Sequence, residues 1–345
     1  MSNAQSHKGI SFSLLLLIIA HIFMTACGSG ADISEPQPSE FTLTPELTPT
    51  TEADRVVLVL PPDSDQAIAS QAEALLKELS ANSGLELEVR QKLESSDITQ
   101  AMKVVVFLDL PENLGSLAAS HSSTQFVAVT DEDWNPSANA AIIRMRESDV
   151  AFIAGYIAAM LAPNYRVGAL LSAEKTAFNE AFANGVYYYC GICASQLYPL
   201  HTYPVTAVQP AGSPPSAWQT AFDQINANKV NVLYVANEAV SAELCAYLST
   251  HDIALIGSQP PLEECRPRWS ATIFSDGISP LSDIWPEILA GNAGGRAINA
   301  AISISDNMYI SVQDGLVWLS EGKFNFAKQT IDLLRNNKIN PLPID

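Results

Sequence analysis

Basic residues are scarce in this chain of 345 residues, which holds 18 Lys and Arg against 37 Asp and Glu and has a formal net charge of −19. Binding to a nucleic-acid backbone needs a basic face, so this composition argues against nucleic acid as a partner. It argues equally against charge-driven binding to anionic lipid. The chain is 48% hydrophobic and long enough to bury a large core, and its length favours two domains.

The sequence also lacks the motifs of common catalytic and nucleotide-binding sites. It contains no G-x-x-x-x-G-K-[ST], G-x-G-x-x-G, G-x-S-x-G or H-E-x-x-H. Beyond the N-terminal region its histidines are His121, His201 and His251, which are far apart and not at metal-ligand spacing. We therefore expect no catalytic residue, no metal site and no cofactor, and any ATP hydrolysis would belong to another polypeptide.

Only the N-terminus carries a long apolar run. Residues 10–23 follow Lys8 and fall short of the roughly 20 apolar residues of a membrane-spanning helix. The tetrapeptide Met-Thr-Ala-Cys that ends at Cys27 resembles a bacterial lipobox. We therefore expect residues 1–27 to be a lipoprotein signal with lipid attachment at Cys27; the alternatives are an ordinary secretory signal or an uncleaved anchor.

Residues 28–53 are rich in Pro, Ser, Thr and Glu and contain too few apolar residues to build a core. We expect a disordered tether that lets a folded body stand off a membrane. Together with lipid on Cys27, this predicts a protein held at the extracytoplasmic face of the cell membrane, with several acyl chains needed for stable attachment.

Strand-like and helix-like segments alternate along the rest of the chain. Short runs rich in Val, Ile and Leu, such as 55–60 and 167–171, are typical of buried parallel strands. The alternation predicts an α/β fold with two doubly wound parallel-sheet lobes joined by a hinge. The predicted lobes are 54–147 with 270–345, and 148–269. The predicted crossings between them are near 146–150, 268–273 and 303–308.

Ligands of parallel α/β sheets bind beyond the carboxyl ends of the strands, and two facing lobes can close over a small molecule. Polar and aromatic residues just past predicted strand ends are therefore the candidate ligand contacts. They are Asp63, Ser64, Asp131, Trp134, Phe178, Asn237, Gln259 and Asp276. Trp134 and Phe178 are expected to stack on a flat ring, and the other side chains to bind hydroxyl groups. The alternative roles are structural: Asp63 or Ser64 as a helix cap, Phe178 in the core and Trp134 on a loop surface.

A helix with an unusually thin face is predicted to start at Glu147. Ala154, Gly155, Ala158 and Ala159 let another backbone approach it closely. The segment Phe152-Ile-Ala-Gly-Tyr-Ile-Ala-Ala-Met, followed by Val167-Gly, Phe178 and Gly185, resembles the basic membrane protein family. These are lipid-anchored substrate-binding proteins of ABC importers, and the best-understood members bind purine nucleosides.

This resemblance implies a type I periplasmic-binding-protein-like fold, a small-molecule ligand, an ABC permease as partner and no enzymatic activity. We expect a monomer. Three segments depart from the nucleoside-binding pattern: Pro61-Pro-Asp-Ser, Gly257-Ser-Gln and Phe274-Ser-Asp-Gly. The ligand is therefore left open between a nucleoside and another small polar solute, and a receptor ectodomain that senses without transport is the alternative function.

Four cysteines remain beyond Cys27, an even number that favours disulfides in an extracytoplasmic protein. Cys245 and Cys265 are expected on the same rim of one sheet, so a bridge between them is predicted. Cys190 and Cys193 form a C-x-x-C, for which we expect a local structural disulfide. The alternatives are a two-cysteine metal site and a thiol–disulfide enzyme, although a helix C-terminus disfavours a reactive thiolate.

Overall fold

The computed structural model describes residues 52–62, 64 and 66–342. The predicted signal, the lipidation site Cys27 and the ligand candidate Asp63 therefore lie outside the described residues. Thr51–Asp345 form one compact unit, which contains every described helix and strand and both disulfides. This unit is the part of the chain that we expect to fold by itself.

The first lobe is built on a six-stranded parallel sheet. Its strands, in spatial order, are β11 (Arg296–Asn299), β5 (Ala140–Arg144), β4 (Gln125–Thr130), β3 (Met102–Phe107), β1 (Arg55–Val59) and β2 (Glu86–Arg90). Val56 and Leu58 point to one face, where they pack with α1 (Gln66–Asn82) and α7 (Pro280–Leu289). Val57 and Val59 point to the other face, toward α2 (Leu114–Ser120). Because both faces are covered, β1 is apolar along nearly its whole length.

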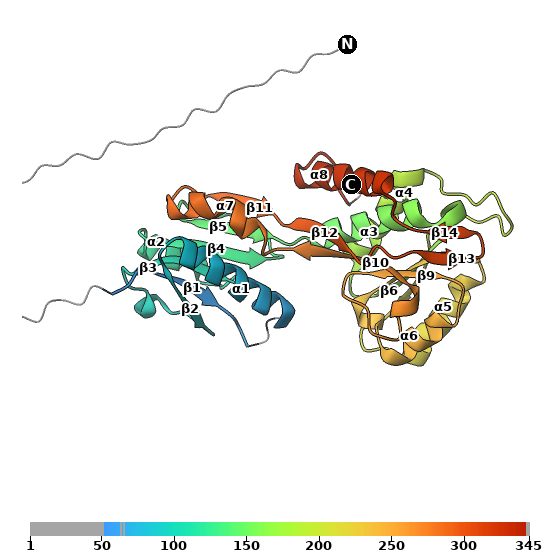
Figure 1. Ribbon diagram of the computed structural model, residues 1–345, viewed down its shortest axis with the longest axis horizontal. Coiled ribbons are helices and arrows are strands. Elements are labelled where there is room, and N and C mark those ends of the chain that lie inside the picture. Colours follow the sequence, from blue (N-terminus) through green and yellow to red (C-terminus); the bar gives the residue numbers. More distant parts are fainter. Residues whose placement is uncertain (1–51, 63, 65, 343–345) are drawn as a thin grey trace, which may run out of the picture. The chain divides into compact units, whose positions relative to one another are not determined.

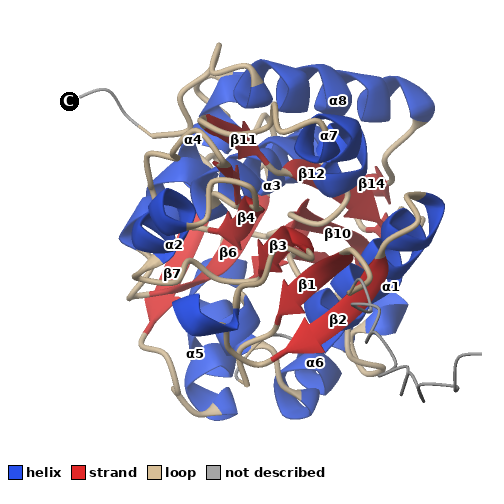
Figure 2. Cartoon of the chain, turned by 90° about the vertical axis from the view of Figure 1, so that its left-hand side faces the viewer, coloured by secondary structure: helices blue, strands red, loops and turns tan. Residues whose placement is uncertain are grey.

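The second lobe has its own six-stranded sheet, in which only β12 runs antiparallel. Its strands, in spatial order, are β12 (Ala301–Ser305), β10 (Trp269–Asp276), β9 (Ala254–Gly257), β8 (Val232–Val235), β6 (Val167–Ser172) and β7 (Val205–Gln209). Its helices are α3 (Glu147–Leu161), α4 (Thr176–Cys190), α5 (Pro215–Asn226), α6 (Ala242–Ser249) and α8 (Glu321–Arg335), and it has a hairpin, β13 (Ile310–Val312) with β14 (Gly315–Val317). Short 3-10 turns occur at Ser95–Asp97, Pro163–Tyr165, Asn237–Ala239 and Arg266–Arg268. Figures 1 and 2 show α3 and α4 on the opposite face of this sheet from α5 and α6.

Helices α3 and α4 cross at two glycines, as the thin face of the first helix predicts. A Cβ atom at Gly155 would lie 2.0 Å from the carbonyl oxygen of Phe182, and one at Gly185 would lie 1.9 Å from that of Phe152. Nearly all of α3 is buried. At this crossing the two helix backbones are in direct contact, with only the hydrogen atoms of the glycines between them. This contact fixes the position of α4 on α3, and with it the residues at the start of α4.

The crossings between the lobes differ from the predicted ones. They fall at 144–147, 276–280 and 299–301, because β10 stays in the second sheet to Asp276 and pairs there with Ala301. In this part of the chain Arg296–Asn299 is strand β11 of the first sheet, Ala301–Ser305 is strand β12 of the second, and residues 310–317 form the hairpin of β13 and β14.

The sequence predicts 270–345 in the first lobe, because the chain is expected to return there just after 269. In the structure only about 277–300 contributes to the first sheet and its core. Ala327, Ile331 and Leu334 of α8 belong to the core of the second lobe. The C-terminal helix therefore covers the second lobe, because its apolar face matches the core built around α3.

Both predicted cysteine pairs are joined. Cys190 is bonded to Cys193, and Cys245 to Cys265. Within the described residues, no group of His, Cys, Asp and Glu is arranged to hold a metal ion. No helix in that part of the chain is both long and apolar enough to cross a bilayer.

Candidate ligand-binding site

A cavity of about 730 Å³ lies where the carboxyl ends of the two sheets face each other. From the first lobe it is lined by residues that follow β3, β4 and β5, among them Asp109, Asp131 and Met145. From the second it is lined by residues at the ends of β6, β8 and β9, among them Ser172 and Ser258. This is the position at which parallel α/β sheets bind ligands, and the volume suits a small molecule.

Five of the predicted contacts line the cavity. They are Asp131, Phe178, Asn237, Gln259 and Asp276. Ser64 does not line it, and Asp63 is outside the described residues. Trp134 is half-buried against the core between the first sheet and α2, so it does not offer its ring to the cavity.

The second lobe supplies an aromatic wall. The ring centroid of Phe178, in the first turn of α4, lies 5.6 Å from that of Tyr234, which in turn lies 5.2 Å from that of Phe182. Phe178 is only 9% exposed, so it serves both the core and the cavity. The crossing of α3 and α4 holds this wall in place.

A chain of hydrogen bonds runs along the floor of this wall. The Tyr234 hydroxyl is 3.2 Å from the Ser258 hydroxyl, which donates to Asn237 Oδ1 at 3.0 Å. Burial raises the pKa of Tyr234, so its phenol stays protonated at any physiological pH. With Oδ1 engaged, the amide nitrogen of Asn237 keeps its two hydrogen-bond donors for a ligand.

Acidic groups dominate the charged lining. In the part of the lining that the structure describes, the carboxylates are Asp109, Asp131, Glu147, Glu238 and Asp276, and the single basic residue is Lys175. Lys175 Nζ lies 2.7 Å from a Glu147 oxygen and 3.2 Å from a Glu238 oxygen. Burial by itself lowers the pKa of Lys175, but the hydrogen bond to Glu147 and the two negative charges outweigh burial and raise it. Lys175 therefore stays protonated, and its positive charge is already compensated by Glu147 and Glu238.

Asp276 stands where β10 leaves the second sheet. Its Oδ1 accepts hydrogen bonds from the backbone N–H groups of Ile278 and Ser279, at 3.0 and 2.9 Å. It therefore stabilises the turn into α7, and a role toward ligand would fall to Oδ2. Gly277 lies next to it in the same crossing, where a Cβ atom would be 2.6 Å from Met145 Sδ of another crossing.

A second cavity of about 620 Å³ adjoins the first and shares Asp131, Glu147, Lys175 and Phe178 with it. Its lining includes Arg144 and Arg146, which do not reach the main cavity. Arg146 donates to the amide oxygens of Asn299 and Asn337, at 3.1 and 3.3 Å. Arg146 thus links the crossing at 144–147 to the crossing at 299–301.

Sequence reasoning missed Lys175, Tyr234 and Phe274 as lining residues. Tyr234 lies in the buried strand β8, where the sequence pattern predicts that an aromatic residue belongs to the hydrophobic core. The signal that could have identified Tyr234 as a lining residue is its position one residue before the end of β8, with the small Ala236 just past that end. Lys175 is missed because its neighbours in space, Glu147 and Glu238, are far away in sequence.

No family model matches the sequence, and no curated protein matches it. Solved structures match the fold. An ABC transporter solute-binding protein from Conexibacter woesei is 16% identical with a TM-score of 0.58, over 84% of this chain and 99% of that one. A solute-binding protein of an ABC transporter system from Aeropyrum pernix is 15% identical with a TM-score of 0.50, over 84% and 93%.

A transcriptional activator of the comK gene from Bacillus halodurans is 12% identical with a TM-score of 0.55, over 83% of this chain and 99% of that one. At such identities the likeness concerns the fold alone. This chain therefore has an α/β, type I periplasmic-binding-protein-like fold.

Proposed function

We propose that this chain is a lipid-anchored, extracytoplasmic solute-binding protein that captures a small polar ligand and delivers it to an ABC permease. The observation that supports it is the cavity between the carboxyl ends of two separate sheets. The chain crosses between these sheets three times, so closure about the crossings would bury a ligand without a chemical step. The lipobox-like sequence and the likeness to the basic membrane protein family support the anchor and the permease.

The charge of the lining limits the ligand to neutral or cationic solutes. Anions are usually bound by arginine or by free ammonium groups. Among the described lining residues, the single ammonium is that of Lys175, which is engaged by two carboxylates, and none of these residues is an arginine. A phosphate or carboxylate ligand would face uncompensated negative charge. Nucleosides, neutral sugars and amines remain, and an amine would gain from the face of Phe178 or Tyr234.

A sensor that uses the same fold without transport is the second candidate. The match to a protein described as a transcriptional activator supports it, because that structure shares the fold at a TM-score of 0.55. A permease that co-purifies with the full-length chain and takes up the solute would favour transport. Ligand binding without uptake would favour sensing.

The test is a thermal-shift screen of the compact unit 51–345 against nucleosides, neutral sugars, amines and, as controls, sugar phosphates and dicarboxylates. A ligand at a hundredfold excess over its Kd should stabilise the unit by about 2.7 kcal/mol. Gln259→Ala should weaken binding at least tenfold, whereas Gln224→Ala, on the exposed side of α5, should not. Stabilisation by the anionic controls alone, or equal binding by both variants, would overturn the proposal.

Lipid attachment is tested separately. The full-length chain, expressed in a bacterium, should partition into detergent and carry acyl mass on Cys27, and Cys27→Ser should remove both properties. A mature protein whose N-terminus does not begin at Cys27 would rule the anchor out.

A further inference from the structure

An uncharged stretch of sequence forms one end of the second lobe. Residues 181–222 contain no Asp, Glu, Lys or Arg, in a chain that is 16% charged. The stretch covers most of α4, the loop 191–204, β7 and the first part of α5. The function proposed above does not use the loop 191–204, because this loop precedes β7, whereas the lining of the cavity follows the strands at the other end of the sheet.

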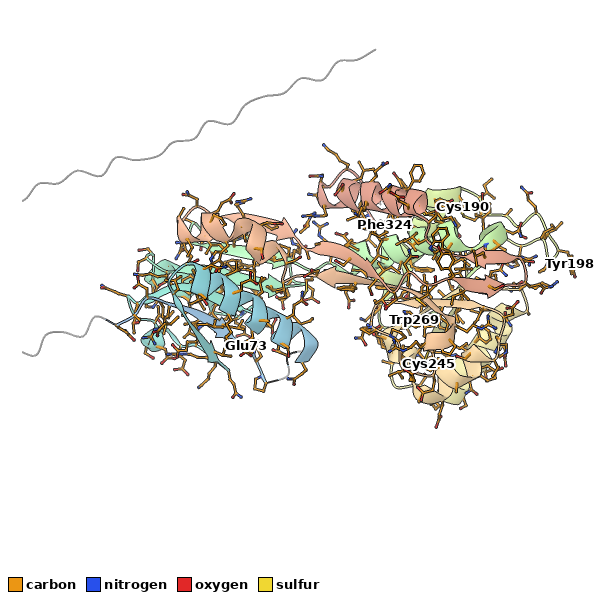
Figure 3. All side chains as sticks on the ribbon, viewed as in Figure 1. Glu73, Cys190, Tyr198, Cys245, Trp269 and Phe324 are labelled. Carbon is orange, nitrogen blue, oxygen red and sulfur yellow. A yellow bond between two sulfur atoms is a disulfide. The ribbon has the colours of Figure 1, made fainter. Side chains whose placement is uncertain are left out.

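The loop exposes large apolar side chains to solvent. Ile192 is 78% exposed, Tyr198 82% and Leu200 76%. Together with Tyr187, Tyr188 and Leu197 they make up what we call the aromatic tip. Figure 3 shows Tyr198 at the outer end of the loop, beyond the ribbon of the sheet. Single exposed apolar residues need no explanation, but a group of them on one loop marks an interaction site.

The backbone beneath the tip is fixed rather than loose. Arg166 is 2% exposed, and its guanidinium donates to the carbonyl oxygens of Leu197 and Tyr198, at 3.2 and 2.9 Å. The same guanidinium pairs with Asp314 at 2.5 Å. The Cys190–Cys193 disulfide closes the start of the loop. A buried cation thus holds a loop whose exposed side chains, Ile192, Tyr198 and Leu200, gain little from the fold. This is expected of a preorganised docking element.

We propose that the aromatic tip inserts into the headgroup region of a lipid bilayer. Tyrosine combines an apolar ring with a polar hydroxyl and is enriched at membrane interfaces. Protein interfaces, by contrast, usually carry charged residues at their rim, and the loop 191–204 has none. Because the tip is uncharged and the chain is acidic, it suits zwitterionic rather than anionic lipid.

The length of the N-terminal segment is compatible with contact between the aromatic tip and a bilayer. If Cys27 is anchored, the residues between it and the compact unit can extend to roughly 80 Å, at about 3.3 Å per residue. The anchor would keep the unit near the bilayer without fixing which face meets the surface. The tip would supply that orientation and a second, reversible membrane contact.

The test uses the unit 51–345, which carries no lipid, and sucrose-loaded phosphatidylcholine vesicles. It should sediment with the vesicles at low and high salt alike, and vesicles rich in phosphatidylserine should bind less at low salt. Ile192→Asp combined with Leu200→Asp should weaken binding at least tenfold. The matched control is Leu289→Asp, on α7 of the first lobe at 43% exposure, which should leave binding unchanged.

A Tyr198→Trp variant reports insertion directly. Its added fluorescence should shift to the blue with vesicles and be quenched by brominated lipid. Near-UV circular dichroism and ligand binding in the cavity should be unchanged in all variants, which separates this test from that of the proposed function. No sedimentation, equal binding by the Asp variants, or a dimer that the Asp substitutions dissociate without any vesicle binding would each overturn the proposal.

Discussion

The crossing of α3 and α4 gives the sharpest stability prediction. Ala is the better helix former, so in an exposed helix Gly→Ala would stabilise by about 1 kcal/mol. At Gly155 the new methyl carbon would lie 2.0 Å from a carbonyl oxygen, more than 1 Å short of the 3.4 Å of ordinary van der Waals contact. The opposing atom is backbone of Phe182, so it cannot move aside as a side-chain end would.

Gly155→Ala must therefore separate the two helices. Overpacking a core typically costs about 1–3 kcal/mol, and separating two backbones lies at or above the top of that range. We expect a net loss of about 3 kcal/mol or more, and the same for Gly185→Ala. At about 2 °C per kcal/mol for a domain of this size, the melting temperature should fall by roughly 6 °C or more.

Urea unfolding of the unit 51–345, followed by circular dichroism, measures this loss. The matched control is Gly322→Ala in α8, where a Cβ atom has no neighbour within 4 Å and should stabilise by about 0.5–1 kcal/mol. If Gly155→Ala unfolded at the same urea concentration as the parent, the close approach of α3 and α4 would be refuted.

Three further predictions concern the rest of the fold. Replacing both Cys245 and Cys265 by Ser opens a loop with a sequence separation of 20 and should lower the free energy of unfolding by about 3 kcal/mol in urea titration; an unchanged value would mean that the bridge does not constrain the unfolded chain. Burial raises the pKa of Asp149 above 3.8, so this carboxylate destabilises the fold at neutral pH and the loss disappears as pH falls through the raised pKa. Asp149→Asn should therefore stabilise the unit at pH 7 and progressively less toward pH 4, and an equal gain at both pH values would contradict this account. Gly277→Ala places a methyl carbon 2.6 Å from Met145 Sδ and 2.7 Å from a γ-carbon of the buried Val129, so it should lower the free energy of unfolding by about 1–3 kcal/mol. Calorimetry should also find weaker ligand binding, and an unchanged Kd would show that this crossing does not bend on closure.

The helix after β5 begins at Glu147, as predicted, and ends at Leu161. Its pattern is local: acidic residues in the first turn, small residues on one face and a proline just past the end. The strand predicted at 55–60 matches β1 (Arg55–Val59) to within one residue for a related reason. A strand that is buried on both faces is a continuous apolar run, and this run can be recognised without knowing which segments pack against it.

The segments after Trp269 were predicted least well. An apolar run indicates a strand but does not say which sheet it joins, and residues 297–304 cross from one sheet to the other at Ala300. Pairing of Asp276 with Ala301 decides the crossing, and that contact joins segments far apart in the sequence. The same limit applies to Trp134, whose position after a strand was correct but whose ring turns into the core.

The amino-acid sequence by itself determined the α/β alternation, the thin face of α3, the two cysteine pairs and the strand ends at which Asp131, Phe178 and Asn237 lie. These features follow from the periodicity of apolar residues, from residue size and from the rule that the carboxyl ends of parallel strands lie at one edge of a sheet. Only the tertiary structure decided that Lys175 is neutralised between Glu147 and Glu238, because their separation in sequence carries no sign of their distance in space. It also decided where the lobes exchange strands, because pairing between distant segments sets that point.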